Sequence, residues 1–275
     1  MKKPMLLSND EFDPKELDYT NMYISIKRDG VRAEITNEGI KNRSLKILRN
    51  PKVQDRFRHF FESFGPHCIL EGEIYSDSLP CREIAGICNS KDRDVPDDLK
   101  LCLFGMYDTM LNFVERNHIL GALYRTLKND DVELVIQHRV HNYQEAIDFY
   151  DEALNNGFEG AVLMDGSKKY KEGRVTIKQH IGYKLKPSKE EDLEIIGVTE
   201  RMENLNESLK NELGQSYKRN TVDAKRGTGI AACFVCKYNG LETNVTITGD
   251  EESRREIWAN KENYTGAYAV VKSMD

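Results

Sequence analysis

The sequence predicts an α+β protein, with antiparallel strands and flanking helices in a first domain and a small β-barrel-like module after it. Residues 20–50 alternate apolar and polar side chains, which is the period of half-buried strands. Residues 143–155 instead repeat apolar side chains at helical spacing. A length of 275 residues suits two domains. An acidic stretch that follows residue 188 marks the expected linker, so we predict domains at 1–188 and 189–275.

The first domain is expected to open with a β-hairpin that turns at Asp29 and Gly30, a residue pair typical of tight hairpin turns. The clearest helix covers residues 143–155, because Asn142 is suited to its N-cap and Gly157 to its end. Other segments show shorter versions of these patterns, and we expect strands at 68–75, 101–108 and 158–163 and a helix at 82–86.

The second domain is expected to be mainly β-structure. Asp250 is a capping candidate for a helix at residues 251–260. Residues 203–229 are polar with little periodicity, so we expect a mobile surface loop there. Apolar segments predict strands at 193–198, 230–238 and 245–248.

Composition restricts the class of protein. The chain is 39% hydrophobic and 31% charged, and no apolar run approaches the roughly 18 residues of a membrane span. Six scattered cysteines are too few for a disulfide scaffold and indicate an intracellular, cytoplasmic protein. Cys233 and Cys236 lie in an apolar run and are expected to pack in a core. A net charge of -6 excludes coating of nucleic acid by bulk charge, although a local basic groove is compatible with it.

The segment KRDGVR at residues 27–32 carries the strongest chemical signal. The predicted hairpin would set Lys27 opposite Arg32, and like charges that face each other are unfavourable unless an anion lies between them. A lysine crowded by a second cation is also more easily neutralised, which makes it a nucleophile. The sequence contains neither a P-loop nor a Gly-x-Gly-x-x-Gly segment after a strand, so neither of these motifs can account for nucleotide binding.

Further motifs follow in a fixed order: LEGE at residues 70–73, YD at 107–108, FEG at 158–160, YKEGR at 170–174 and KLK at 184–186. Together with KRDGVR they resemble the covalent nucleotidyltransferases, and most closely the small viral and phage ATP-dependent DNA ligases. The resemblance covers most of the first 190 residues. It implies a nucleotidyltransferase (adenylation) domain followed by an OB-fold domain.

The resemblance implies a role for each matching residue. Lys27 would attack the α-phosphate of ATP and carry AMP, and Lys184 and Lys186 would stabilise that phosphate. Glu159 would bind Mg²⁺ or Mn²⁺, with Glu73 as a second candidate ligand. The nucleotide itself would be held by Ser25, Lys27, Arg32, Glu73, Lys184 and Lys186, with either Phe104 or Tyr107 stacked on adenine.

The resemblance also assigns contacts with DNA. Arg43 and Arg174 would grip the 5′-phosphate at a nick, although the order Asn-Arg-Ser at Arg43 departs from the usual pattern. In the second domain, Lys218, Arg219, Lys225 and Arg226 form a basic cluster able to contact phosphates of a duplex. Family members continue beyond the strand that matches residues 268–272 into a basic motif that orients pyrophosphate. Because this sequence stops at Asp275, we expect slow self-adenylation relative to the sealing of an already adenylylated nick.

These observations predict an ATP-dependent DNA ligase that seals nicked duplex DNA as a monomer without a protein partner or a membrane. An RNA ligase or a GTP-dependent capping enzyme shares the lysine motif and is the enzymatic alternative. A non-catalytic nucleic-acid-binding OB protein is the alternative from another class. If the enzyme is viral, the cytoplasm of an infected cell is its expected location.

Overall fold

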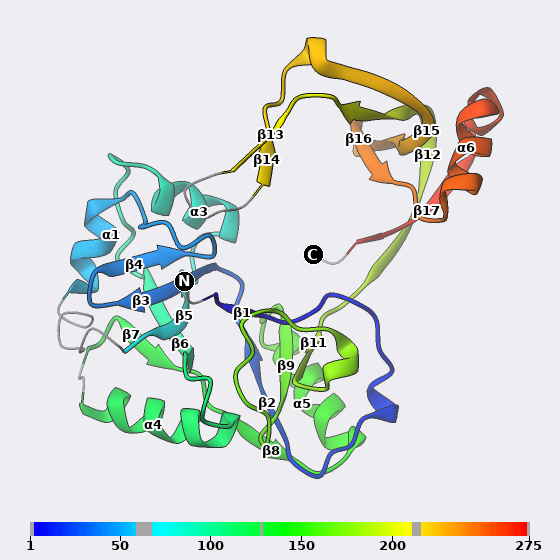
Figure 1. Cartoon of the computed structure of the whole chain (residues 1–275). Helices are drawn as coiled ribbons and strands as arrows, with labels where there is room; N and C mark the ends of the chain where they lie inside the picture. The colour runs from blue at the N-terminus through cyan, green and yellow to red at the C-terminus, as the bar shows by residue number, and fades with distance from the viewer. Residues whose placement is uncertain (1–2, 59–67, 127–128, 211–215, 274–275) are drawn as a thin grey trace. The chain divides into compact units, whose positions relative to one another are not determined.

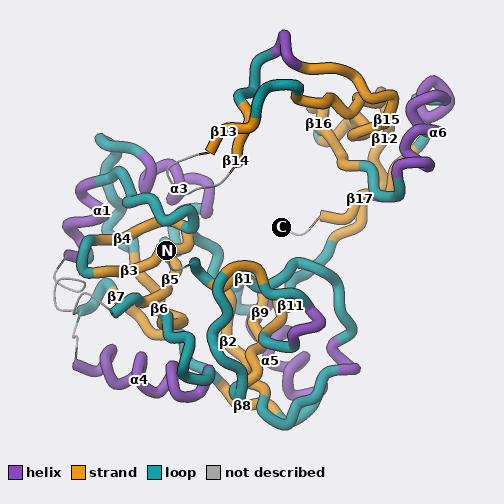
Figure 2. Tube along the Cα trace, in the orientation of Figure 1, coloured by secondary structure: helices purple, strands orange, loops and turns teal. Residues whose placement is uncertain are grey.

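The computed structural model describes residues 3–58, 68–126, 129–210 and 216–273. The chain forms two compact units, Met1–Pro187 and Ser188–Asp275, and Figure 1 shows the elements of each. The first unit contains two large sheets with helices beside them and one two-stranded sheet, and the second contains mainly strands (Figure 2). Within the described residues, no helix is long and apolar enough to cross a membrane.

One sheet of the first unit has the strand order β11-β9-β2-β8, and its paired strands are antiparallel. Helix α5 (Tyr143–Asn155) packs on this sheet, where Ala146 is fully buried with Ile24 and Leu163. The strands are β2 (Met22–Lys27), β8 (His138–Val140), β9 (Gly160–Asp165) and β11 (Gly182–Leu185).

The other sheet has the order β4-β3-β5-β6-β7 and is antiparallel except for its last pair. The apolar face of this sheet packs against helices, and together they form the largest hydrophobic core, which includes Ile35, Leu70 and Leu101. The strands are β3 (Val31–Thr36), β4 (Gly39–Asn42), β5 (Leu70–Tyr75), β6 (Lys100–Met106) and β7 (Val132–Leu134). The helices are α1 (Pro51–Arg56), α3 (Cys81–Asn89) and α4 (Phe113–Thr126).

The predicted hairpin around Asp29 and Gly30 is wrong, because β2 and β3 belong to different sheets. Strand β2 pairs with β8 and β9, whereas β3 pairs with β4 and β5. The turn instead carries the chain from one sheet to the other. Gly30 is required there, since a Cβ atom at this position would lie 2.4 Å from the carbonyl oxygen of Ile74.

Several predicted elements are confirmed. Asn142 caps α5, and its side chain accepts a hydrogen bond of 3.0 Å from the Glu145 amide. Gly157 follows the helix with a φ of 81°, as expected for a glycine at a helix end. The predicted strands at 68–75, 101–108 and 158–163 correspond to β5, β6 and β9, and the helix at 82–86 lies within α3.

The second unit is built on an antiparallel sheet of order β16-β15-β12-β17. Register shifts in β12 interrupt its pairing with β15, and Ile195, Ile230 and Cys236 are buried. Asp250 caps α6 as predicted. The elements are β12 (Lys189–Asn204), β15 (Lys225–Tyr238), β16 (Leu241–Thr246), β17 (Tyr268–Ser273) and α6 (Glu251–Ala259).

Two predictions for this unit need correction. The acidic residues after 188 form no separate linker, because they begin β12 and pair with β17. The polar segment 203–229 is also not simply a loop: it includes the paired strands β13 (Ser208–Lys210) and β14 (Ser216–Lys218).

Within the first unit, the shorter strands β1 (Met5–Leu6) and β10 (Gly173–Arg174) pair in parallel.

Candidate active site

A cavity of about 290 Å³ lies between the two large sheets of the first unit. One wall is a row of side chains from adjacent strands, because Ser25 of β2 pairs with Val162 of β9, which pairs with Lys184 of β11. Strands β2 and β8 are antiparallel, and His138 pairs with Ile24. The residue before His138, Gln137, therefore lies beside Ser25 and extends the row. Residues paired across a sheet share a face, and the four members of the row all line the cavity: Gln137, Ser25, Val162 and Lys184.

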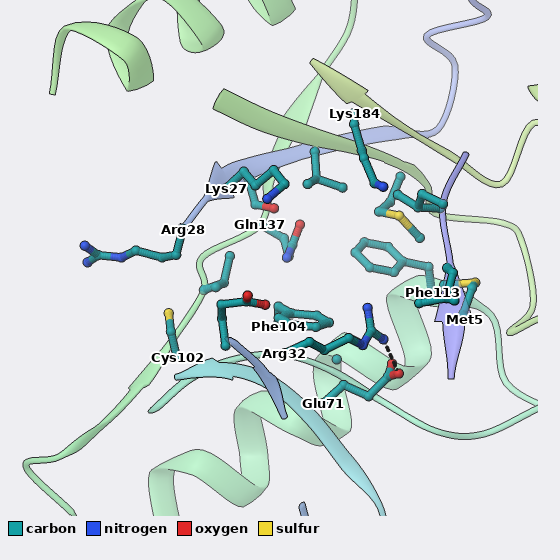
Figure 3. Close-up of a pocket in the computed structure, with 18 of the residues that line it drawn as sticks. Met5, Lys27, Arg28, Arg32, Glu71, Cys102, Phe104, Phe113, Gln137 and Lys184 are labelled. Atoms are coloured by element: carbon teal, nitrogen blue, oxygen red, sulfur yellow. Dashed lines mark hydrogen bonds and ion pairs between the residues drawn. The ribbon is translucent and has the colours of Figure 1, made fainter. Parts of the chain in front are cut away.

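The opposite wall has a second row, formed by Arg32 of β3, Glu73 of β5 and Cys102 of β6. Phe104 lies farther along β6 and presents its ring to the same space (Figure 3). The Arg32 guanidinium lies 5.0 Å from the centre of that ring. The cavity therefore combines a flat apolar surface with cationic side chains from both sheets.

Lys27 ends β2 and lies against Glu159, which immediately precedes β9. Lys27 contacts one carboxylate oxygen, and Lys186 contacts the other. The Glu159 amide also donates a hydrogen bond of 3.1 Å to the Lys27 carbonyl. Burial opposes ionisation of Glu159, but hydrogen bonds from both lysines hold its pKa below the ordinary value. A carboxylate thus joins the lysine of the first motif to a lysine of the last.

The backbone at Gly160 makes this arrangement possible. Its φ is 148°, and a Cβ atom there would lie only 2.1 Å from the Leu185 carbonyl oxygen. Any larger residue would separate β9 from β11. The fold therefore explains why a glycine follows Phe158 and Glu159. Gly160 lets β11 come close to β9, and Lys186, which directly follows β11, then reaches Glu159.

Lys184 points into the cavity from the first wall (Figure 3) and donates a hydrogen bond of 2.7 Å to Asn9 Oδ1. Burial, reinforced by neighbouring positive charges, lowers its pKa to about 8. Arg43, just after β4, and Arg174 of β10 contribute to this effect. Both arginines are exposed and line the cavity. The concentrated positive charge makes the site suitable for a polyanion.

Glu73 is the other carboxylate with an altered proton affinity. Burial raises its pKa to about 7, although Lys27 and Arg32 act in the opposite direction. The Glu73 and Glu159 carboxylates also oppose each other's ionisation, which contributes to the higher value. A positive ligand placed near them would favour the ionised form of Glu73.

Arg32 does not face Lys27 as a cross-strand pair; it forms an ion pair with Glu71 (Figure 3). Glu71 is buried and also accepts a hydrogen bond of 2.7 Å from the Tyr170 hydroxyl. That hydroxyl in turn accepts one of 2.7 Å from the Met5 amide. Glu71 and Tyr170 were not assigned individual roles from the sequence, although both lie within motifs that the sequence displays.

The structure separates the two aromatic candidates. Phe104 lines the cavity, whereas Tyr107 is absent from the described lining residues and donates a hydrogen bond of 2.7 Å to Glu172. Gln137 was not predicted from the sequence, because one glutamine between two short strands carries no motif. Its place in the row could be recognised only after β2 and β8 were seen to pair.

The basic cluster of the second unit lies where β14 ends and β15 begins. Lys218 donates a hydrogen bond of 2.8 Å to the Asn204 carbonyl, and Arg226 lies 3.5 Å from Glu203. All four predicted side chains are exposed: Lys218, Arg219, Lys225 and Arg226. They form a polar surface of this unit.

Comparisons with known proteins identify the class and then the family. The chain superposes on a Chlorella virus DNA ligase-adenylate with a TM-score of 0.59 and 20% identity, covering 100% of this chain and 92% of that one. A Lig E DNA ligase gives a TM-score of 0.73 at 16% identity, covering 100% and 93%. The fold is that of a nucleotidyltransferase domain followed by an OB-fold domain, as the motifs predicted.

The family model described as "ATP dependent DNA ligase domain" matches residues 4–186, and the chain belongs to this family. A curated DNA ligase from African swine fever virus is 23% identical over 216 residues, which are 73% of this chain. The chain spans about half the length of the curated relatives it matches, 50% for this one. The resemblance to a viral type of ATP-dependent ligase is confirmed.

Proposed function

We propose that this protein is an ATP-dependent DNA ligase that seals nicks in duplex DNA through a lysyl-AMP intermediate on Lys27. The observation that carries the proposal is the contact of Lys27 and Lys186 with one carboxylate, because Lys27 lines a cavity that Lys184 also lines. A nucleophile, a carboxylate and cationic groups are the components required for transfer at a phosphate.

In the first step, Lys27 gives up its ammonium proton to solvent, and the resulting amine attacks the α-phosphate of ATP. An N–P bond forms, the bond from the α-phosphorus to the bridging oxygen breaks, pyrophosphate leaves, and the nitrogen releases a second proton. Glu159 holds the Lys27 side chain in place before the reaction. Lys184 and Lys186 neutralise charge on the phosphate, which is the main protein contribution expected in phosphoryl transfer.

The base and ribose would occupy the space between the two walls. Phe104 is our candidate for the stacking ring, because it lines the cavity opposite the row that contains Val162. Ser25 and Glu73 line the same space and would contact the polar edges of the nucleoside. Arg32 is held by Glu71 and is pre-oriented toward the nucleotide.

Glu159 and Glu73 are the residues that would hold Mg²⁺ or Mn²⁺. Among the described residues, no group of three His, Cys, Asp or Glu side chains forms a complete protein cage. Two carboxylates still fit magnesium, which commonly binds one or two carboxylates together with phosphate oxygens and water. When bound, the cation would neutralise charge on the phosphates. Glu159 would exchange a lysine contact for the cation.

In the later steps, AMP passes from Lys27 to the 5′-phosphate at the nick, and the 3′-hydroxyl then displaces AMP. Arg43 and Arg174 are suited to grip the 5′-phosphate, because they are exposed at the cavity and guanidinium groups bind phosphate through two hydrogen bonds. The basic cluster of the second unit, Lys218, Arg219, Lys225 and Arg226, would contact the DNA backbone without reading base sequence.

The enzyme would act as a monomer in DNA repair, replication or recombination. The curated relatives are viral, which supports action in the cytoplasm of an infected cell.

A sealing assay tests the proposal. The wild-type protein is incubated with Mg²⁺, ATP and a nicked duplex labelled at the 5′-phosphate, and Lys27→Arg serves as the matched variant. Sealing that requires ATP and Lys27 is expected. Sealing of only an RNA nick would favour an RNA ligase, and labelling of the protein by GTP alone would favour capping chemistry. Duplex binding without any nucleotide transfer would leave a non-catalytic binding protein.

A further inference from the structure

Gln137 is a polar side chain of the cavity with no function assigned so far. It lies immediately before β8 and projects into the space that contains Lys27 and Phe104 (Figure 3). Its Oε1 atom is buried and has no hydrogen-bond partner among the described residues. A buried acceptor without a partner is unfavourable unless a ligand or water satisfies it.

The surroundings of Gln137 restrict the ligand group that it can meet. Ser25 is its neighbour in the row, and Val162 lies beyond Ser25. Phe104 lies on the opposite wall. A flat base held between Phe104 and Val162 would therefore turn one polar edge toward Gln137.

We propose that Gln137 determines base specificity by binding the exocyclic amino group of a 6-aminopurine nucleotide. This inference rests on the proposed function, which places the base in this cavity. Rotation about the terminal bond of the side chain is soft, so the amide can bring its oxygen to the ligand. There Oε1 accepts a hydrogen bond from the 6-amino group, while Nε2 is available to an adjacent ring nitrogen.

The donor and acceptor pattern of the base explains the selectivity. Adenine presents an amino donor beside a ring-nitrogen acceptor, and an amide side chain matches both. Guanine presents an oxygen at the same position, which would face the glutamine oxygen unfavourably. Purine with only hydrogen at this position leaves that oxygen without a partner, as it is in the free protein.

The test compares equilibrium binding of ATP with that of purine riboside 5′-triphosphate, which lacks only the 6-amino group. Both nucleotides are titrated in the presence of Mg²⁺ into the Lys27→Ala protein, which cannot form the covalent intermediate. We expect ATP to bind about tenfold more tightly, as is usual for one hydrogen bond to a buried group. Gln137→Leu in the same background should reduce that ratio to about one.

Gln144→Leu is the matched control, because Gln144 carries the same amide at an exposed position of α5 and is not among the described residues that line the cavity. It should leave the ratio unchanged. Equal binding of the two nucleotides before Gln137 is replaced would overturn the proposal, as would a preference that survives Gln137→Leu. Loss of the preference in Gln144→Leu would also contradict it.

Thermal unfolding of each variant shows whether Gln137→Leu is folded. If it is not, Gln137→Asn provides the second variant, in which a shorter side chain withdraws the amide and should also reduce the ratio. The proposed ligase activity is tested by a separate measurement. If ATP with a labelled α-phosphate leaves no covalent label on the wild-type protein, that activity is rejected. Tighter binding of ATP that depends on Gln137 would still establish the base contact.

Discussion

The Lys27 ammonium group lies against the Glu159 carboxylate, and this contact joins β2 to the start of β9 at the cavity. Lys186 contacts the other oxygen of the same carboxylate. Glu159 therefore has two tasks in the proposed reaction: it positions the nucleophile before ATP binds, and it is available to the divalent cation afterwards.

Glu159→Gln should slow covalent labelling of the protein by about a hundredfold, because a neutral amide neither pairs with the lysines nor binds the cation well. The initial rate of labelling with ATP carrying a labelled α-phosphate measures this effect. Glu152→Gln, at an exposed position of α5, is the control and should label at the wild-type rate. Equal rates in the two variants would remove Glu159 from the reaction.

The stability of the free protein should depend on the ionisation of Glu73. Its pKa rises from the ordinary 4.5 to about 7 in the folded protein, chiefly through burial. Between these values the folded state binds more protons than the unfolded state, so stability falls as pH rises through this window. The loss amounts to about 3 kcal/mol by linkage.

Glu73→Gln cannot ionise and should escape that loss. Urea unfolding at pH 5 and pH 8 measures the difference in unfolding free energy between variant and wild type. We expect this difference to shift in favour of the variant at the higher pH. A difference that is the same at both pH values would show that Glu73 does not titrate in this range.

ATP binding should weaken as Lys184 loses its proton. Its pKa is lowered to about 8, mainly by burial, so the free protein loses this positive charge above that pH. Lys184→Arg stays protonated because a guanidinium does not titrate in this range. The KM for ATP in the labelling reaction should therefore rise between pH 7 and pH 9 in the wild type and change less in the variant. Parallel profiles would contradict the role of Lys184.

The Tyr170 hydroxyl should contribute to stability through its bonds with Glu71 and the Met5 amide. Tyr170→Phe leaves the buried Glu71 carboxylate and the half-buried Met5 amide with one hydrogen bond fewer each, and it should lower the unfolding free energy by about 1–3 kcal/mol. Tyr238→Phe, at an exposed position, is the control and should change it little. An unfolding midpoint for Tyr170→Phe equal to that of the wild type would mean that water replaces both contacts.

Local elements were predictable from the sequence because local chemistry fixes them. The Asn142 side chain caps the first turn of α5, and the helical repeat of apolar residues follows directly. The positions of β5 and β6 were visible for the same reason. Strand pairing was not, because nothing in residues 27–32 shows that the turn at Gly30 crosses between sheets.

The candidate site was predictable to the extent that its residues belong to ordered motifs. Lys27, Glu159 and Lys186 were selected in this way, and the structure brings them together. The contacts of Glu71 and Gln137 depend on long-range register and burial, which a single sequence does not reveal. The acidic start of β12 was predicted to be a linker for a related reason. Its partner strand, β17, lies near the end of the chain, and this long-range pairing is not visible in the sequence.

Identification of the residue that carries AMP tests the central claim most directly. The wild-type protein is incubated with Mg²⁺ and ATP labelled on the α-phosphate, denatured, digested and analysed by mass spectrometry. The account predicts denaturation-resistant AMP on Lys27 and no label in Lys27→Ala. AMP on another residue, or label that persists in Lys27→Ala, would contradict it.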